Sequence, residues 1–208
     1  MDQATEPKTQ QTTINVCLVR HGETDWNRED RLQGREDIEL NDRGREQARV
    51  TAAYLQRYNW NVIVTSPLKR AQETATIIAH HLGIKQVDVT PEFVQRDYGA
   101  ASGLTYAEID KIFPDNVIPR IEDRYSLTVR CMEGLNSLPS KYPSSNIVVV
   151  THSAVIKAIL GAVSGHEVNV GGRHMGNAGV SLLQFHGGTW EIESYNATFH
   201  LAPSGSTR

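Results

Sequence analysis

Short apolar runs alternate with helix signals along most of this 208-residue chain. The runs at 14–19, 61–65, 87–89 and 147–151 have the length and composition of strands, and segments with helical signals lie between them. Buried strands separated by helices are typical of a mostly parallel sheet with both faces covered. We therefore predict an α/β fold, a single three-layer α/β/α domain with a mostly parallel central sheet.

The expected helices carry recognisable start signals. Asn41 is a suitable N-cap for a helix that continues to about residue 56. Ser66 followed by Pro67 is typical of an N-cap and a first helical residue, which predicts a helix to residue 82. Thr105 and Glu108 have the spacing of a capping box. Two more helices are expected, with a closing β-hairpin across Gly187-Gly188; the ranges are 125–138 and 154–163 for the helices, and 180–185 and 189–195 for the strands.

Composition limits the domain organisation and the class of protein. A hydrophobic share of 39% suits one domain with a full core, which we place at residues 14–201. The polar ends, 1–13 and 202–208, are predicted to be disordered tails. A net charge of −3 with no basic excess argues against nucleic-acid binding, and no apolar run is long enough to cross a membrane. Cys17 and Cys131 are expected to stay reduced, which predicts a cytoplasmic protein, while the oligomeric state stays open.

Polar side chains follow three of the expected strands. Arg20 and His21 come directly after the first strand, Arg70 lies in the first turn of the helix after the second, and His152 follows the strand at 147–151. Each alone could be an ordinary surface or loop residue. Ligands of such sheets bind beyond the carboxyl ends of the strands, and helix N-termini there favour anions. Together, the guanidinium groups and the nitrogen nucleophile of His21 indicate a phosphate site.

The motifs at these positions resemble those of the histidine phosphatase superfamily, the phosphoglycerate mutase-like family. The likeness covers about residues 14–201 and is closest to bacterial broad-specificity histidine phosphatases. The stretches that carry it are Val19-Arg20-His21-Gly22-Glu23-Thr24 with Trp26-Asn27, Leu32-Gln33-Gly34, Asn41-Asp42-Arg43-Gly44, Ser66-Pro67-Leu68-Lys69-Arg70-Ala71-Gln72-Glu73-Thr74-Ala75, Arg96-Asp97-Tyr98-Gly99 and Val150-Thr151-His152-Ser153.

The resemblance implies a set of roles. His21 would become phosphorylated while Arg20, Arg70 and His152 hold the phosphoryl oxygens. The substrate would be a small-molecule phosphate ester, and neither a metal nor another cofactor is implied. The residues expected to line the substrate pocket are Asn27, Gln33, Gly34 and Ser153.

Gln95 departs from the family pattern. In members of the family, a Glu that serves as acid and base stands four residues before the Gly of a motif such as Arg96-Asp97-Tyr98-Gly99. An amide forms hydrogen bonds but does not exchange the proton at neutral pH. Either the chain is a weakened form, natural or engineered, or a neighbour substitutes. Asp97 is the first alternative because it lies two residues on, and Glu92 is less well placed.

The resulting functional hypothesis is a phosphomonoesterase that acts through a phosphohistidine intermediate, impaired by Gln95 in the acid/base position. The short stretch between Gly99 and His152 leaves little chain for a closing lid, which favours hydrolysis. One alternative is a cofactor-dependent phosphotransferase of the phosphoglycerate mutase type. Another is a non-catalytic module that binds phosphate esters. The identity of the substrate and its pathway stay open.

Overall fold

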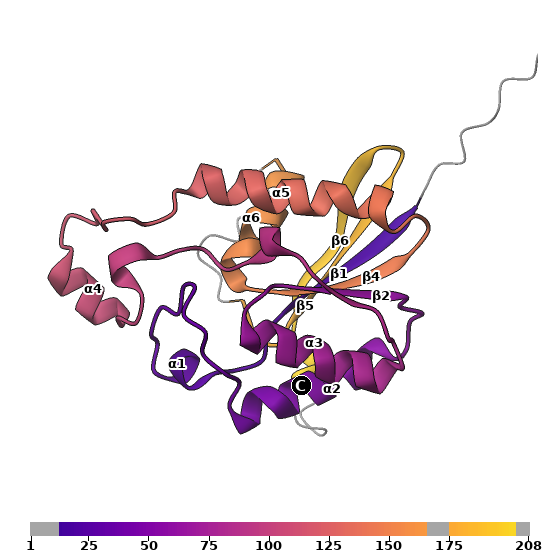
Figure 1. The fold of residues 1–208 in the computed structure, drawn as a ribbon, viewed down its shortest axis with the longest axis horizontal. Helices are drawn as coiled ribbons and strands as arrows, with labels where there is room; N and C mark the ends of the chain where they lie inside the picture. The colour runs from indigo at the N-terminus through magenta and orange to yellow at the C-terminus, as the bar shows by residue number, and fades with distance from the viewer. Residues whose placement is uncertain (1–12, 166–174, 203–208) are drawn as a thin grey trace, which may run out of the picture.

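A computed structural model describes residues 13–165 and 175–202, and it contains one six-stranded sheet with helices on both faces (Figure 1). Apart from Thr13 and Ala202, the predicted tails lie outside the described residues. The strands are β1 (Ile14–Arg20), β2 (Val62–Thr65), β3 (Val87–Val89), β4 (Asn146–Thr151), β5 (Val180–His186) and β6 (Thr189–Ala197). The α-helices are α1 (Asp25–Arg28), α2 (Asp42–Leu55), α3 (Lys69–Leu82), α4 (Tyr106–Ile112), α5 (Arg124–Lys141) and α6 (Ser153–Val163).

The sheet has the strand order β3-β2-β4-β1-β5-β6. The pairs β1–β4, β2–β4 and β2–β3 are parallel, and the hairpin of β5 and β6 extends the sheet antiparallel to β1. The prediction of a mostly parallel sheet within an α/β domain is therefore confirmed. The hairpin itself was expected, but its place beside β1 could not be inferred from local signals.

Two apolar layers flank the sheet because alternate residues of each strand point to opposite faces. In β1, Val16 and Leu18 pack toward α5 and α6, whereas Cys17 and Val19 pack toward α2 and α3. Figure 1 shows α5 and α6 on one side of the sheet and α2 and α3 on the other. This arrangement is the three-layer architecture expected from the sequence.

Helix α3 begins later than the sequence predicts. Its first residue is Lys69, with Leu68 at the N-cap, so Ser66 and Pro67 lie outside the helix. The backbone N–H of Lys69 donates to Asp37 Oδ1 at 2.7 Å, which supplies a cap from another loop. The Ser66 hydroxyl accepts from Leu68 N at 3.3 Å, ahead of the helix, and also bonds to Nε2 of His152 at 2.7 Å.

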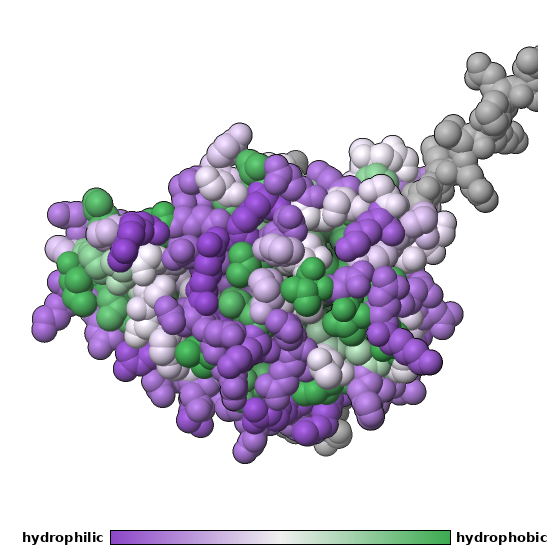
Figure 2. All heavy atoms as spheres, in the orientation of Figure 1, coloured by the Kyte–Doolittle hydropathy of each residue, from purple (hydrophilic) through white to green (hydrophobic). Residues whose placement is uncertain are grey.

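The short helices α1 and α4 lie together at one end of the molecule, on the left in Figure 1. Helix α4 has the expected capping box, since Thr105 and Glu108 exchange hydrogen bonds. Figure 2 shows hydrophobic side chains on the surface at this end, where Ile112 and Val117 are 53% and 75% exposed. In the described part of the chain, no helix is both long and apolar enough to span a membrane.

Candidate functional site

The two histidines predicted at strand ends lie next to one another. Parallel pairing of β1 with β4 sets Arg20 opposite Thr151, so His21 and His152 leave neighbouring strands at the same edge. Their ring centroids are 5.2 Å apart, and the backbone N–H of His21 donates to Thr151 O at 2.9 Å. The topology of the sheet therefore brings together residues that are 131 positions apart in sequence.

His21 is held as a neutral imidazole, and its Nε2 has no hydrogen-bond partner among the described residues. Its Nδ1 lies 2.7 Å from the carbonyl oxygen of Gly22, which is only an acceptor, so the hydrogen is on Nδ1. Burial lowers the pKa of His21 well below its ordinary value, and the charges of Arg70 and Arg20 lower it further. At neutral pH, Nε2 thus carries a lone pair, as a nucleophile requires.

His152 is fully buried and bonds to Ser66, with its Nε2 2.7 Å from Ser66 Oγ. Its Nδ1 is buried and has no hydrogen-bond partner in the described parts of the chain. Burial and the nearby charge of Arg70 lower the pKa of His152 well below its ordinary value. A buried polar atom of this kind calls for a partner, and a bound anion would supply one.

Arg20 and Arg70 are buried cations whose hydrogen bonds go to backbone carbonyl groups. Arg20 donates to Met175 O, and Arg70 donates to Gly34 O at 2.8 Å and to Glu36 O at 2.6 Å. Neither forms an ion pair with any described residue, and the Nε atom of each has no partner there.

Burial lowers the pKa of each of these arginines to about 10, so both stay charged at neutral pH. The charge of Arg20 also lowers the pKa of Arg70, because the two cations lie within electrostatic range. Two like charges in a buried pocket are unfavourable unless an anion joins them. A negatively charged ligand between the two guanidinium groups would offset this repulsion.

Asn27 and Gln33 reach the same pocket through a shared partner, Thr24. Asn27 Oδ1 accepts from Thr24 N and Thr24 Oγ1, each at 3.2 Å, and from Asn177 Nδ2 at 3.0 Å. Gln33 Nε2 donates to Thr24 Oγ1 at 2.7 Å, while Gln33 Oε1 is buried without a partner among the described residues. The amide of Asn177 also donates to His21 O at 3.1 Å.

Gly34 and Ser153, predicted to line the pocket, are each adjacent to one of its charged or imidazole side chains. Gly34 has φ +52°, a conformation that favours glycine, and its carbonyl group orients Arg70. Ser153 is the first residue of α6, directly after His152. Gly34 thus contacts Arg70, while direct contact of Gly34 or Ser153 with substrate stays a prediction.

Gly22 is required for space rather than for a sharp turn. Its φ is not positive, but an added Cβ would lie 2.3 Å from Gly44 O. The N–H of Gly22 donates to Thr74 Oγ1 at 3.1 Å, and this hydroxyl donates to Arg70 O at 2.7 Å. The loop after β1 is therefore hydrogen-bonded to Thr74 of α3 and packs closely against Gly44 in the first turn of α2.

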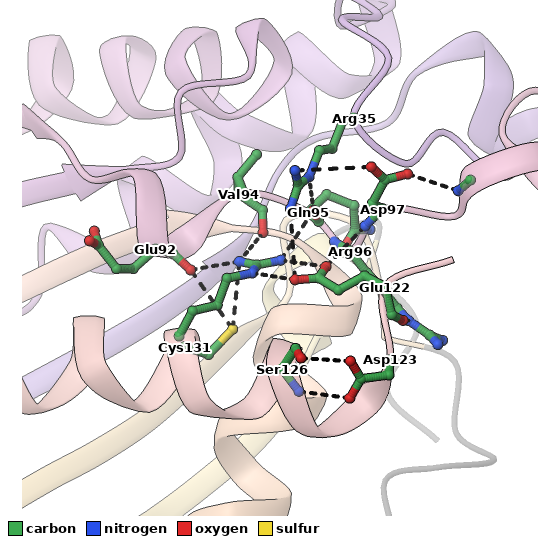
Figure 3. Close-up of polar contacts among 12 residues, drawn as sticks. Arg35, Glu92, Val94, Gln95, Arg96, Asp97, Glu122, Asp123, Ser126 and Cys131 are labelled. Atoms are coloured by element: carbon green, nitrogen blue, oxygen red, sulfur yellow. Dashed lines mark hydrogen bonds and ion pairs between the residues drawn. The ribbon is translucent and has the colours of Figure 1, made fainter. Parts of the chain in front are cut away.

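Gln95 is buried, with 6% of its surface exposed, on the segment between β3 and α4. Its Oε1 accepts from Arg96 N at 3.0 Å, and its Nε2 has no partner among the described residues. Asp97 is more exposed; its Oδ1 accepts from Gly99 N at 2.8 Å and its Oδ2 lies 4.0 Å from Arg35. Figure 3 shows the carboxylate of Glu92 pointing away from Gln95, so neither neighbour duplicates the position of residue 95.

The described His, Cys, Asp and Glu side chains form no group of three that could hold a metal ion. The sequence reasoning missed Ser66, Thr74 and Asn177, which contact the histidines and arginines of the pocket. Ser66 carried a signal that was interpreted as a helix cap. Thr74 stands within one of the stretches that carry the family likeness, but the sequence assigned no role to Thr74 or to Asn177.

Comparison with known proteins decides the family. Residues 16–198 match the family model of the histidine phosphatase superfamily (branch 1). The chain belongs to the histidine phosphatase superfamily. The predicted family and the predicted enzyme class, a phosphoric monoester hydrolase, are thereby confirmed.

Three relatives within the superfamily are close over nearly the whole chain. An uncharacterized phosphatase PhoE of Bacillus subtilis is 43% identical over 90% of this chain and 96% of its own length. A metal-independent phosphoserine phosphatase of Arabidopsis thaliana is 29% identical, with 95% of this chain and 87% of the relative covered. The structure of a mycobacterial glucosyl-3-phosphoglycerate phosphatase complexed with VO3 matches with a TM-score of 0.80 and 29% identity, covering 88% of this chain and 99% of that one.

Proposed function

We propose that this protein hydrolyses small phosphate monoesters through a phosphohistidine formed on His21. The observation that carries the proposal is the pair of buried cations, Arg20 and Arg70, which have no carboxylate partner among the described residues and adjoin two neutral imidazoles. A phosphoryl group satisfies this pocket because it brings negative charge and several acceptor oxygens.

The reaction proceeds in two displacements. Nε2 of His21 attacks phosphorus, a P–N bond forms and the P–O ester bond breaks, and the leaving ester oxygen takes a proton from a solvent water molecule to become an alcohol. A second water molecule then attacks the phosphohistidine and the P–N bond breaks; its proton passes to the hydroxide left by the first step, and inorganic phosphate and neutral His21 are released. Arg20, Arg70 and His152 hold the phosphoryl oxygens in both displacements.

Gln95 limits the first displacement. With Oε1 bound to the N–H of Arg96, its NH2 group is left to donate a hydrogen bond toward the leaving oxygen. It transfers no proton, so esters with poor leaving groups turn over slowly. A carboxylate in the same position would keep one oxygen on the N–H of Arg96 and use the other to carry the proton.

The names of the relatives support a small phosphorylated metabolite as the substrate class, since they include phosphatases of phosphoserine and of glucosyl-3-phosphoglycerate. Two buried, unpaired cysteines, Cys17 and Cys131, support the cytoplasm as the compartment. Their burial raises both thiol pKa values, so neither is a competing nucleophile at neutral pH.

A phosphatase panel with phosphoserine, 3-phosphoglycerate and 4-nitrophenyl phosphate tests the proposal on the protein and on Gln95→Glu. We expect Gln95→Glu to raise hydrolysis of the two alkyl esters by on the order of 10²–10⁴-fold, and that of the aryl ester much less, because nitrophenolate leaves without a proton. His21→Ala should form no acid-labile phosphoprotein.

Three outcomes would contradict the proposal. A phosphoprotein that persists in His21→Ala would remove the nucleophile assignment. An isomerised phosphate ester without free phosphate would identify a mutase. Tight ester binding with no turnover, even in Gln95→Glu, would identify a binding module.

A further inference from the structure

An ion pair between Arg130 of α5 and Glu122 of the loop before it is hydrogen-bonded to segment 92–97, which carries Gln95. We propose that Arg130 and Glu122 are positioning residues which fix the side chain at position 95 toward the phosphoryl pocket. This inference rests on the proposed function, because it assigns residue 95 a place in that chemistry. Neither residue lies in the motifs that mark the pocket in the sequence.

Arg130 uses all five N–H groups of its guanidinium, three on carbonyl groups of this segment and two on Glu122. Its Nη1 donates to Glu92 O at 2.8 Å and to Val94 O at 2.7 Å, and its Nη2 donates to Gln95 O at 3.3 Å. The remaining donors form a fork with Glu122, since Nε lies 2.7 Å from Oε1 and Nη2 lies 2.9 Å from Oε2. A lysine ammonium could not replace this planar set of five donors.

Glu122 holds the other side of residue 95. Its Oε2 also accepts from Asp97 N at 3.1 Å, and its carbonyl group accepts from Arg96 Nε at 2.8 Å. Arg35 adds a longer contact, with Nε 3.5 Å from Gln95 O, and lies 3.7 Å from the Glu122 carboxylate. The backbone is thus held by hydrogen bonds before, at and after Gln95.

The pair is largely withdrawn from solvent, with side-chain exposures of 18% for Arg130 and 12% for Glu122. Burial raises the pKa of Glu122, but the hydrogen bonds from Arg130 and Asp97 N outweigh it and leave the pKa below its usual value. The carboxylate therefore stays ionised at neutral pH. A fully hydrogen-bonded buried pair gives a rigid attachment point.

The position of the Gln95 side chain depends on this attachment, because the side chain forms few hydrogen bonds itself. Its one hydrogen bond among the described residues is to the N–H of the next residue, Arg96, which moves with the same backbone. A displacement of about 1 Å at a catalytic group can cost about 10²-fold in rate. Holding the backbone at 92–97 in place therefore also holds the side chain at position 95 in place. In Gln95→Glu, that side chain is the carboxylate that carries the proton.

A double-mutant cycle tests the proposal in the full-length protein. Arg130→Lys is made in the Gln95→Glu and in the Gln95→Ala background, and hydrolysis of phosphoserine is measured. In the Gln95→Glu background we expect Arg130→Lys to lower kcat by about tenfold to a hundredfold with little change in KM. The carboxylate at position 95, which would be displaced, acts on the leaving oxygen and does not bind the substrate. With Gln95→Ala the same substitution should cost little, because no side chain is left to position.

Arg130→Lys keeps the positive charge, which matters because the charge of Arg130 also lowers the pKa of His152. Arg49→Lys is the matched control, as Arg49 forms an exposed ion pair with Glu46 on α2. If Arg130→Lys fails to fold, Glu122→Gln breaks the same fork while keeping the size of the side chain. Equal losses of kcat in both backgrounds would overturn the proposal.

A second measurement needs no turnover and separates this inference from the proposed function. The side-chain amide of Gln95 gives NMR signals that can be assigned by their loss in Gln95→Glu. Arg130→Lys should shift these signals and speed their exchange with water, while Arg49→Lys should not. Unchanged signals would overturn the positioning role even if the protein is a phosphatase, and absent turnover would overturn the proposed function alone.

Discussion

The arginines of the phosphate pocket and Arg130 are all withdrawn from water, yet they are partnered in opposite ways. Arg20 and Arg70 contact backbone carbonyl groups and keep unpaired Nε atoms in the described structure. Arg130 is saturated, with a carboxylate and three carbonyl oxygens. The charges of Arg20 and Arg70 therefore have no carboxylate beside them and are available to a ligand. The charge of Arg130 is paired with Glu122, and its donors hold the chain in place. In the function proposed above, the two pocket arginines bind the ligand and Arg130 is structural, and it is their hydrogen-bond partners, more than their burial, that distinguish them.

Removal of Arg70 gives the largest expected effect. We expect Arg70→Met to lower kcat/KM by on the order of 10³–10⁵, because it removes a cation that stabilises the transferring phosphoryl group. Unfolding free energy should fall far less than for a change at Arg130, since no buried carboxylate loses its counter-charge. Steady-state kinetics and urea unfolding check both statements. Activity of Arg70→Met within tenfold of the parent would break the comparison.

Arg130→Met should have the reverse profile. Breaking this largely buried ion pair leaves Glu122 with only the longer contact to Arg35, at 3.7 Å, which should cost about 3 kcal/mol of unfolding free energy. Arg49→Met, at an exposed pair, should cost about 0.5 kcal/mol or less. Affinity for inorganic phosphate, measured by calorimetry, should be retained in Arg130→Met at a temperature where it is folded. A loss of phosphate affinity as large as in Arg70→Met would show that the two regions are not separate.

Acid should destabilise the pocket before it affects the carboxylates. The folded-state pKa values of His21 and His152 lie well below the ordinary value, so stability is fully present above about pH 6.5 and is lost as the pH falls below it. Each histidine contributes a slope of at most about 1.4 kcal/mol per pH unit. His200 has a lowered pKa too, so single His→Asn variants apportion the slope. The interpretation fails if unfolding free energy stays flat from pH 7 to pH 5.

Chelation should have no effect on turnover. Arg20 and Arg70 provide the positive charge at the transferring group, so hydrolysis needs no divalent cation. Activity of Gln95→Glu on phosphoserine, measured before and after EDTA, checks this. Activity lost to the chelator and restored by magnesium would contradict it.

Local signals in the sequence were enough for most of the elements and for the strand-end residues, although they did not indicate the short helix α1 and set the start of α3 too early. Arg20 ends β1, and His21 and His152 directly follow strands with clear apolar runs, which parallel pairing brings together. A side chain that suits two roles gave a wrong prediction at Ser66. Serine is typical of a helix N-cap, but here its hydroxyl group bonds to His152.

Contacts that depend on tertiary placement left no trace in the sequence. Arg130 has the spacing of an ordinary helix residue, and only the approach of α5 to the segment 92–97 gives its guanidinium carbonyl groups to bind. The same holds for Asn177, whose amide reaches His21 O because the hairpin pairs with β1. The missed residues are therefore those whose partners lie on another element.

The close approach of Gly22 to Gly44 limits how this chain can be diversified in the laboratory. A Cβ at Gly22 would lie 2.3 Å from Gly44 O, and a Cβ at Gly44 would lie 2.1 Å from Glu23 O. Because each added carbon meets backbone, no second substitution of a side chain relieves the clash. In a saturation library across these loops, positions 22 and 44 therefore have to stay glycine. Variants with altered specificity have to come from other positions at this end of the molecule, where residues such as Tyr106 are exposed.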